Sequence, residues 1–288
     1  MEVATVEFVV TQPDRPRGRG RRVVAPAVKL AAAEWGLPVY QPNTHAEVLG
    51  LFEEANLDVA VVVAYGRILK PAVLEAVEHG FVNVHFSLLP RWRGAAPVER
   101  AILAGDDYTG VSLMVLDEGL DTGPVCAVAE IEITEYETAG ELTGRLASLG
   151  ADVLRDHLDD YVNEKLQPAR QMRTGATMAP RLSTDEAELD VSATPSEFSR
   201  AVRAFNPRPG GWVTAEGQRL KVFEVGPATP QLEPGVLEIR GGRPILGLHF
   251  GSVELIEVQP AGKPRVSGQA WANGRRGVGL TVAARGEH

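Results

Sequence analysis

The sequence predicts an α/β fold in two parts, a doubly wound and mostly parallel sheet followed by a small C-terminal β-barrel. Strand-like and helix-like segments alternate up to about residue 163. Residues 58–64 form a continuous apolar run, which is typical of a strand buried on both faces of a parallel sheet. Beyond residue 212 only short strand-like pieces separated by Gly and Pro occur, as in small barrels.

The first part alternates strands and helices in chain order. Strands are predicted at 3–10, 39–41, 58–64, 81–85, 111–116 and 125–133, where β-branched and apolar residues gather. Helices are predicted at 26–35, 44–56, 71–79, 96–104 and 138–163. Thr44 with Glu47 and Thr138 with Glu141 form capping boxes for two of them. This alternation indicates right-handed βα units and hence an open parallel sheet.

The pattern changes after residue 165. Residues 166–190 lose the alternation and indicate a linker. Thr194 with Glu197 then caps a short helix that ends near residue 205. Strands follow at 212–215, 219–225, 235–239, 245–249, 252–258 and 277–282. We therefore expect a first domain at 1–165, a linker at 166–190 and a barrel domain at 191–288.

Composition excludes several classes of protein. No run of about 18 apolar residues occurs, so we expect no membrane span. The single cysteine, Cys126, excludes an internal disulfide framework, and no cluster has metal-ligand spacing, so no metal is expected. The acidic, alternating start is unlike a secretory signal, and the chain is expected to be cytoplasmic.

The net charge of −9 is unevenly distributed. Residues 191–288 hold twelve Lys and Arg against eight Asp and Glu, whereas residues 1–190 hold seventeen against thirty. Within the acidic part, eight residues carry five arginines: Arg15, Arg17, Arg19, Arg21 and Arg22. Such runs are often only solvated chain, but five cations without an intervening acid favour a loop that contacts phosphates.

The residues that suggest chemistry follow the strand at 81–85. Asn83 and His85 are two apart and share one strand face, near the end where open α/β sheets bind ligands. An amide can donate to an oxyanion, and an imidazole can accept a proton. A lone histidine is more often a satisfied interior residue. Asp121, in an acidic loop between two strands, could orient that ring, although Asp and Gly form turns in many proteins.

These segments together resemble the folate-dependent formyltransferase superfamily. The resemblance is carried by Asn83, His85 and the stretches 87–90, 93–97 and 120–123. The stretch 11–16, the arginine loop and residues 204–207 narrow it to the methionyl-tRNA formyltransferases. It covers nearly the whole chain, and it implies a Rossmann-like first domain and an OB-like barrel.

The resemblance also implies roles for individual residues. Asn83 would polarise the formyl carbonyl, His85 would assist removal of a proton from the attacking amine, and Asp121 would hold the histidine or a water. The formyl donor would be 10-formyltetrahydrofolate. Its site would be formed by Ser87, Leu88, Leu89 and Pro90 and by Tyr65, Gly66, Arg67, Ile68 and Leu69.

The acceptor implied by the resemblance is the free α-amino group of methionyl initiator tRNA, formylated for initiation of protein synthesis. The five loop arginines, with Arg181 and Arg208, would bind this tRNA, and the barrel would add Arg200, Arg203, Arg219 and Lys221. We expect a monomer without a membrane partner.

One departure and two alternatives stay open. Relatives begin with a strand, a Gly-Thr-Pro turn and a helix before the strand at 3–10, and this chain starts after that unit. Its neighbouring strands are therefore expected to have unpaired edges. The chain could be a formyltransferase or hydrolase acting on another substrate. It could also be an N-terminally truncated form that binds tRNA or folate with impaired turnover.

Overall fold

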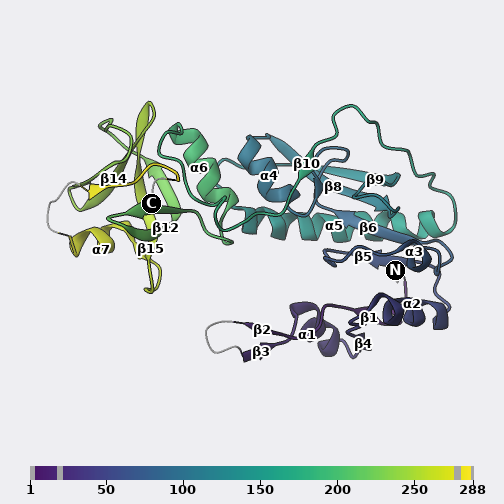
Figure 1. Cartoon of the computed structure of the whole chain (residues 1–288). Helices are drawn as coiled ribbons and strands as arrows, with labels where there is room; N and C mark the ends of the chain where they lie inside the picture. The colour runs from purple at the N-terminus through teal and green to yellow at the C-terminus, as the bar shows by residue number, and fades with distance from the viewer. Residues whose placement is uncertain (1–3, 18–21, 276–279, 287–288) are drawn as a thin grey trace. The chain divides into compact units, whose positions relative to one another are not determined.

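The computed structural model describes residues 4–17, 22–275 and 280–286 (Figure 1). The chain divides into two compact units. The first comprises residues 1–93, 110–130 and 147–178, and the second comprises residues 94–109, 131–146 and 179–288. We describe each unit by itself.

A four-stranded mixed sheet organises the first unit, in the order β5-β6-β8-β9. Its strands are β5 (Ala60–Val62), β6 (Phe81–His85), β8 (Tyr108–Val115) and β9 (Val125–Glu132). β6 pairs in parallel with β5 and antiparallel with β8. The α/β class is confirmed, and the bounds of β6 are those predicted. All five residues of β6 are buried, so this strand is the core of the sheet.

The two strands expected to have unpaired edges, at 3–10 and 58–64, are shorter and more exposed than predicted. Of the described residues in 3–10, only β1 (Val9–Val10) is a strand, and it pairs with β4 (Val39–Tyr40) in a separate two-stranded sheet. The prediction that 58–64 is buried on both faces is wrong, because Val61 and Val63 are 40% and 52% exposed. Among the described residues, one neighbouring strand pairs with each of β1 and β5, and the length and burial of a strand depend on its partners.

Helices cover this unit largely as their end signals predict. They are α1 (Ala27–Glu34), α2 (His45–Glu54), α3 (Pro71–Leu74) and the long α5 (Ala139–Val162). The Thr44 hydroxyl accepts from the Glu47 N–H at 3.2 Å, which confirms Thr44 as the N-cap, and the Glu47 carboxylate accepts from the Asn43 N–H at 2.8 Å. α3 stops after four residues, much earlier than predicted. Gly150 of α5 lies against β6, where a Cβ would come within 2.7 Å of Val84.

An antiparallel barrel dominates the second unit (Figure 1). The strand order is β11-β12-β15-β14-β13-β17, and β16 pairs with β15. An isolated bridge between Ala215 and Val282, the residue after β17, joins the two ends of the sheet, so the barrel is nearly closed. The bounds are β11 (Trp212–Ala215), β12 (Gln218–Pro227), β13 (Val236–Arg240), β14 (Arg243–Leu248), β15 (Gly251–Pro260), β16 (Val266–Ser267) and β17 (Leu280–Thr281).

Three helices complete the second unit. They are α4 (Pro97–Ala104), α6 (Pro195–Ala204) and α7 (Gly268–Asn273), of which α7 was not predicted. The capping box of α6 is confirmed, since the Thr194 hydroxyl accepts from Glu197 N–H at 3.3 Å and the Glu197 carboxylate accepts from Thr194 N–H at 2.9 Å. α6 places Phe198 and Val202 in the barrel core. Short strands β7 (Arg93–Gly94) and β10 (Met178–Ala179) pair with each other.

Candidate active site

β6 brings the amide and the imidazole of the predicted site into the interior of the first unit. Asn83 is 9% exposed and His85 is 6% exposed. Asn83 lies opposite Val62 of β5 and Met114 of β8, and His85 lies opposite Ser112. A strand paired on both sides holds its side chains rigidly, so the spacing of this pair is determined by the sheet.

The hydrogen bond of His85 identifies which ring nitrogen can accept a proton. The Nε2 atom lies 2.9 Å from the Trp92 carbonyl oxygen. A carbonyl only accepts, so we assign the ring proton to Nε2, and the neutral ring then has its lone pair on Nδ1. Nδ1 lies 3.8 Å from Oδ2 of Asp121. The basic nitrogen therefore stands beside a carboxylate that would stabilise the protonated ring.

Asp121 comes from the loop between β8 and β9 and adopts an unusual backbone conformation. Its φ is +52°, in the left-handed region that non-glycine residues rarely occupy. Its side chain is 13% exposed. Asp117 organises the start of the loop, because its Oδ1 accepts from the Gly119 N–H at 3.0 Å and from the Thr122 hydroxyl at 2.7 Å. The sequence prediction that Asp121 lies near His85 agrees with this geometry.

Two buried hydroxyl groups, those of Ser87 and Ser112, hold the backbone of the segment 87–90. The Ser87 hydroxyl donates to the Arg91 carbonyl at 2.6 Å, and Ser87 is fully buried. The Ser112 hydroxyl donates to the Ser87 carbonyl at 2.7 Å and accepts from the Leu89 N–H at 3.1 Å. Ser87 thus supports the segment internally, and the predicted folate contacts would come from its neighbours.

The turn after β5, at residues 64–69, is sharp and is held by hydrogen bonds between side chains and backbone carbonyls. Residues 64 and 66 have φ of +48° and +75°, which turns the chain sharply. The Tyr65 carbonyl accepts from the Gln12 amide at 2.9 Å, and Arg67 donates to the Pro42 carbonyl at 3.0 Å. Burial raises the pKa of Tyr65, although Arg67 opposes this shift. Ile68 is 75% exposed, whereas Leu69 packs against the local core.

The predicted tRNA-binding arginines are only partly described. β2 (Arg15–Arg17) and β3 (Arg22–Val24) form a hairpin in which Arg17 pairs with Arg22. Arg15 is exposed and donates to Gln12 at 3.1 Å. Arg19 and Arg21 lie outside the described residues. In the second unit Arg181 and Arg208 are exposed.

The barrel gathers three cations of which the sequence indicated two. Burial lowers the pKa of Lys221, and the nearby charges of Arg219 and Arg265 lower it further. Arg219 stacks over Trp212 at 3.8 Å from the ring centroid, and Arg265 stacks over Phe223 at 3.4 Å. Arg265 is far from the other two in sequence, and strand pairing is what brings it to them. We name this set the barrel cation cluster: Arg219, Lys221 and Arg265.

Arg203 is a poorer candidate than the sequence suggested. Burial lowers the pKa of its guanidinium, and its Nη1 donates to the Glu137 carbonyl at 3.0 Å. The carboxylate of Glu137 is itself paired with Arg145 at 2.8 Å. Arg203 therefore serves the packing of the second unit.

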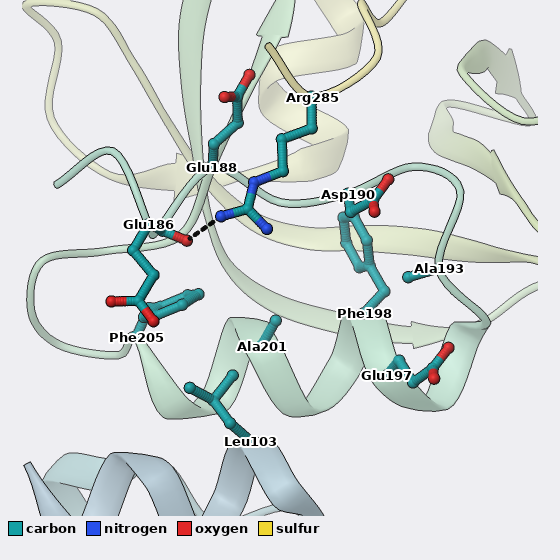
Figure 2. A pocket seen from close by; sticks show the side chains of 10 residues that line it. All are labelled: Leu103, Glu186, Glu188, Asp190, Ala193, Glu197, Phe198, Ala201, Phe205 and Arg285. Atoms are coloured by element: carbon teal, nitrogen blue, oxygen red, sulfur yellow. Dashed lines mark hydrogen bonds between the residues drawn. The ribbon is translucent and has the colours of Figure 1, made fainter. Parts of the chain in front are cut away.

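A separate cavity of about 170 Å³ lies in the second unit (Figure 2). Four carboxylates line it, and Arg285 donates to the Glu186 carbonyl at 3.2 Å. Arg100 pairs with Glu186 and lowers the pKa of that carboxyl group. An acidic lining repels anions, so this cavity does not suit the folate or the RNA phosphates that the sequence resemblance predicts. Its carboxylates are Glu186, Glu188, Asp190 and Glu197.

In the parts of the chain that the structure describes, no three His, Cys, Asp or Glu side chains are arranged to hold a metal ion. Within those same parts, each helix is too short or too polar to cross a bilayer.

Each of the two parts of the chain matches a known protein family. Residues 1–158 match the family model described as "Formyl transferase", and residues 181–276 match "Formyl transferase, C-terminal domain". The methionyl-tRNA formyltransferase of Myxococcus xanthus is 46% identical over 266 residues, which cover 91% of this chain and 85% of the relative. That of Neisseria meningitidis serogroup C is 42% identical over 94% of this chain and 89% of the relative.

Solved structures share the fold at low identity. HypX from Aquifex aeolicus, crystallised with tetrahydrofolic acid, has a TM-score of 0.67 at 16% identity, over 92% of this chain and 46% of that one. An N-formyltransferase from Helicobacter canadensis, in complex with folinic acid and dTDP-3-aminofucose, has a TM-score of 0.64 at 16% identity. It is matched over 100% of its length and 89% of this chain.

Proposed function

Because this chain belongs to the methionyl-tRNA formyltransferase family, we propose that it transfers the formyl group of 10-formyltetrahydrofolate to the free α-amino group of methionyl initiator tRNA. The observation that carries the proposal is the pairing of a proton-accepting Nδ1 of His85 with Asp121 at 3.8 Å. Asn83 lies two residues before His85 on the same rigid strand.

The protein contributes a general base, a hydrogen-bond donor to the oxyanion and a general acid to this reaction. The amine has an unperturbed pKa of roughly 8 and is mostly protonated near neutrality, so it must first lose one proton to solvent to become a nucleophile. His85 takes a second proton from the neutral amine on Nδ1 as the amine nitrogen bonds to the formyl carbon. Asn83 donates to the oxygen of the tetrahedral intermediate. The bond to the folate nitrogen then breaks, and His85 returns a proton to that nitrogen.

The donor and acceptor sites are further parts of the proposal. We propose that residues 65–69 and 87–90 form the folate site, in which Ser87 is an internal support and its neighbours make the contacts. We propose that seven arginines contact the tRNA: Arg15, Arg17, Arg19, Arg21, Arg22, Arg181 and Arg208. The barrel cation cluster supports a phosphate partner, since burial and, after it, the charges of Arg219 and Arg265 lower the pKa of Lys221, and a bound anion would stabilise these three cations.

The remaining expectations follow from this activity. We propose domains at 1–165 and 191–288 with a linker at 166–190, and the matched ranges 1–158 and 181–276 support that division. A cytoplasmic location and a monomeric state are also part of this proposal.

The test is transfer of labelled formyl from 10-formyltetrahydrofolate to methionyl initiator tRNA, with the His85→Gln variant as control. We expect transfer by the wild type and a loss of about 1,000-fold in the variant, as general bases and their charge partners contribute at this scale. Transfer to a sugar amine instead would favour another substrate class. Binding of tRNA without transfer would show a binding protein and refute the proposal.

A further inference from the structure

Gln171, in the segment between α5 and β10, connects the two backbone stretches that hold the candidate base and its carboxylate. Its Nε2 donates to the Asp121 carbonyl at 2.9 Å and to the Gly123 carbonyl at 2.7 Å. Its Oε1 accepts from Arg93, at 3.0 Å from Nε and 2.6 Å from Nη2. One half-buried side chain thus joins the Asp121 loop to the stretch after β6.

The chemical type of this side chain matches its place. Both amide hydrogens meet a carbonyl, and the amide oxygen meets a guanidinium. Glutamate would keep the contact with Arg93 but has no hydrogen to donate to the two carbonyls. Lysine would donate to the carbonyls but could not accept from Arg93. A primary amide can both donate to the two carbonyls and accept from the guanidinium of Arg93.

The same segment also supports the partner of His85. The Trp92 carbonyl accepts from His85 at 2.9 Å, and the Trp92 N–H donates to the Thr177 hydroxyl at 2.9 Å. The next N–H, that of Arg93, donates to the Thr177 carbonyl at 2.9 Å. Residues 171–177 therefore contact both the stretch that holds the imidazole and the loop that holds the carboxylate.

Asp121 has particular need of such support. Its left-handed backbone, at φ +52°, is strained for an aspartate and persists only where neighbours hold it. Gln171 binds the carbonyl of this residue and the carbonyl two positions later. Loss of these bonds would let the backbone relax and move the carboxylate away from Nδ1, which lies 3.8 Å from it.

We infer that Gln171 is a positioning residue for formyl transfer, which maintains the distance between Asp121 and His85 without touching either substrate. The inference rests on the proposed function for its kinetic effect. Its structural effect, on the surroundings of the His85 ring, is independent of that function.

The test compares Gln171→Glu with Gln167→Glu. Gln167 lies in the same segment, is exposed and makes only a local bond, to the Glu164 carbonyl at 3.2 Å, so it receives the same change of charge away from the site. For Gln171→Glu we expect kcat to fall about 10- to 100-fold, as misplaced catalytic groups lose rate on this scale. We expect KM for both substrates to change less than about twofold, because the residue holds a catalytic group and binds no substrate.

A second readout is the ring signal of His85 in a two-dimensional ¹H–¹³C spectrum, assigned with His85→Gln. This signal should move in Gln171→Glu and stay in place in Gln167→Glu. If Gln171→Glu does not fold, Gln171→Asn, which is neutral but one methylene shorter, is measured with the same expectations.

Three outcomes would overturn the inference: a kcat within about threefold of the wild type, a rise of KM at constant kcat, or an unmoved ring signal. A wild-type protein that transfers no formyl group would refute the proposed function instead. The ring signal would still decide the role of Gln171 in that case.

Discussion

Replacement of Asp121 by asparagine tests the electrostatics of the site most directly. The change keeps the size of the side chain and removes its charge. Oδ2 lies 3.8 Å from Nδ1 of His85, and the two side chains are only 13% and 6% exposed. At this separation a carboxylate and an imidazolium attract by about 4 kcal/mol with an effective dielectric constant of about 20.

That attraction exists only while the ring is protonated. It therefore lowers the energy barrier between the reactants and the state in which His85 has taken the proton. Each 1.36 kcal/mol corresponds to about a factor of ten in rate, which sets an upper limit near 1,000-fold. Since the amide and its surroundings recover part of the loss, we expect kcat to fall about 100- to 1,000-fold in Asp121→Asn.

The assay is single-turnover formyl transfer at saturating concentrations of both substrates, so that chemistry is measured apart from binding. Glu118→Gln, an exposed carboxylate in the same loop, is the matched control and should retain the wild-type rate. A rate for Asp121→Asn within about fivefold of the wild type would refute the reasoning, because the charge would then stabilise no step that limits turnover.

Three further predictions follow. Burial raises the pKa of Cys126 to about 11, so its alkylation by iodoacetamide at pH 8 should be about 100-fold slower than that of an ordinary thiol, and urea should abolish the difference. Thr194→Ala removes the bond to the Glu197 N–H and should cost about 1 kcal/mol in the free energy of unfolding; an unchanged urea midpoint would contradict it. Arg219→Gln with Arg265→Gln should reduce the slope of log affinity for tRNA against log salt by about one per lost phosphate contact, while an unchanged slope would leave the pair without a role in binding.

Signals that act over a few residues predicted the local structure well. The capping residues Thr44, Thr138 and Thr194 each precede a helix at the expected place, because a cap and its partner are only three residues apart. The bounds of β6 and β11 were also predicted, since each begins directly after a glycine and is rich in aromatic or β-branched residues. The two-residue spacing of Asn83 and His85 was sufficient to place them on one strand.

Features that depend on partners were harder to predict. The short β1 and the exposed face of β5 follow from which strands pair. An apolar run in the sequence does not indicate which strands will lie beside it in the sheet. α7 has six residues, too few for a helical period to be recognised. Gln171 lies 50 residues from Asp121 and 78 from Arg93, in a polar segment where nothing local distinguishes it.

The near closure of the barrel depends on residues 280–283. Besides the Ala215 bridge, the Val282 N–H donates to the Gly235 carbonyl at 2.8 Å and the Ala283 N–H donates to the Thr214 carbonyl at 3.0 Å. Without these residues β13 loses its pairing with β17 and β11 loses the partners of Thr214 and Ala215, and an unpaired edge can recruit a strand from another molecule. Proteins cut back before Leu280 should therefore aggregate during expression even though every residue of the candidate active site is present.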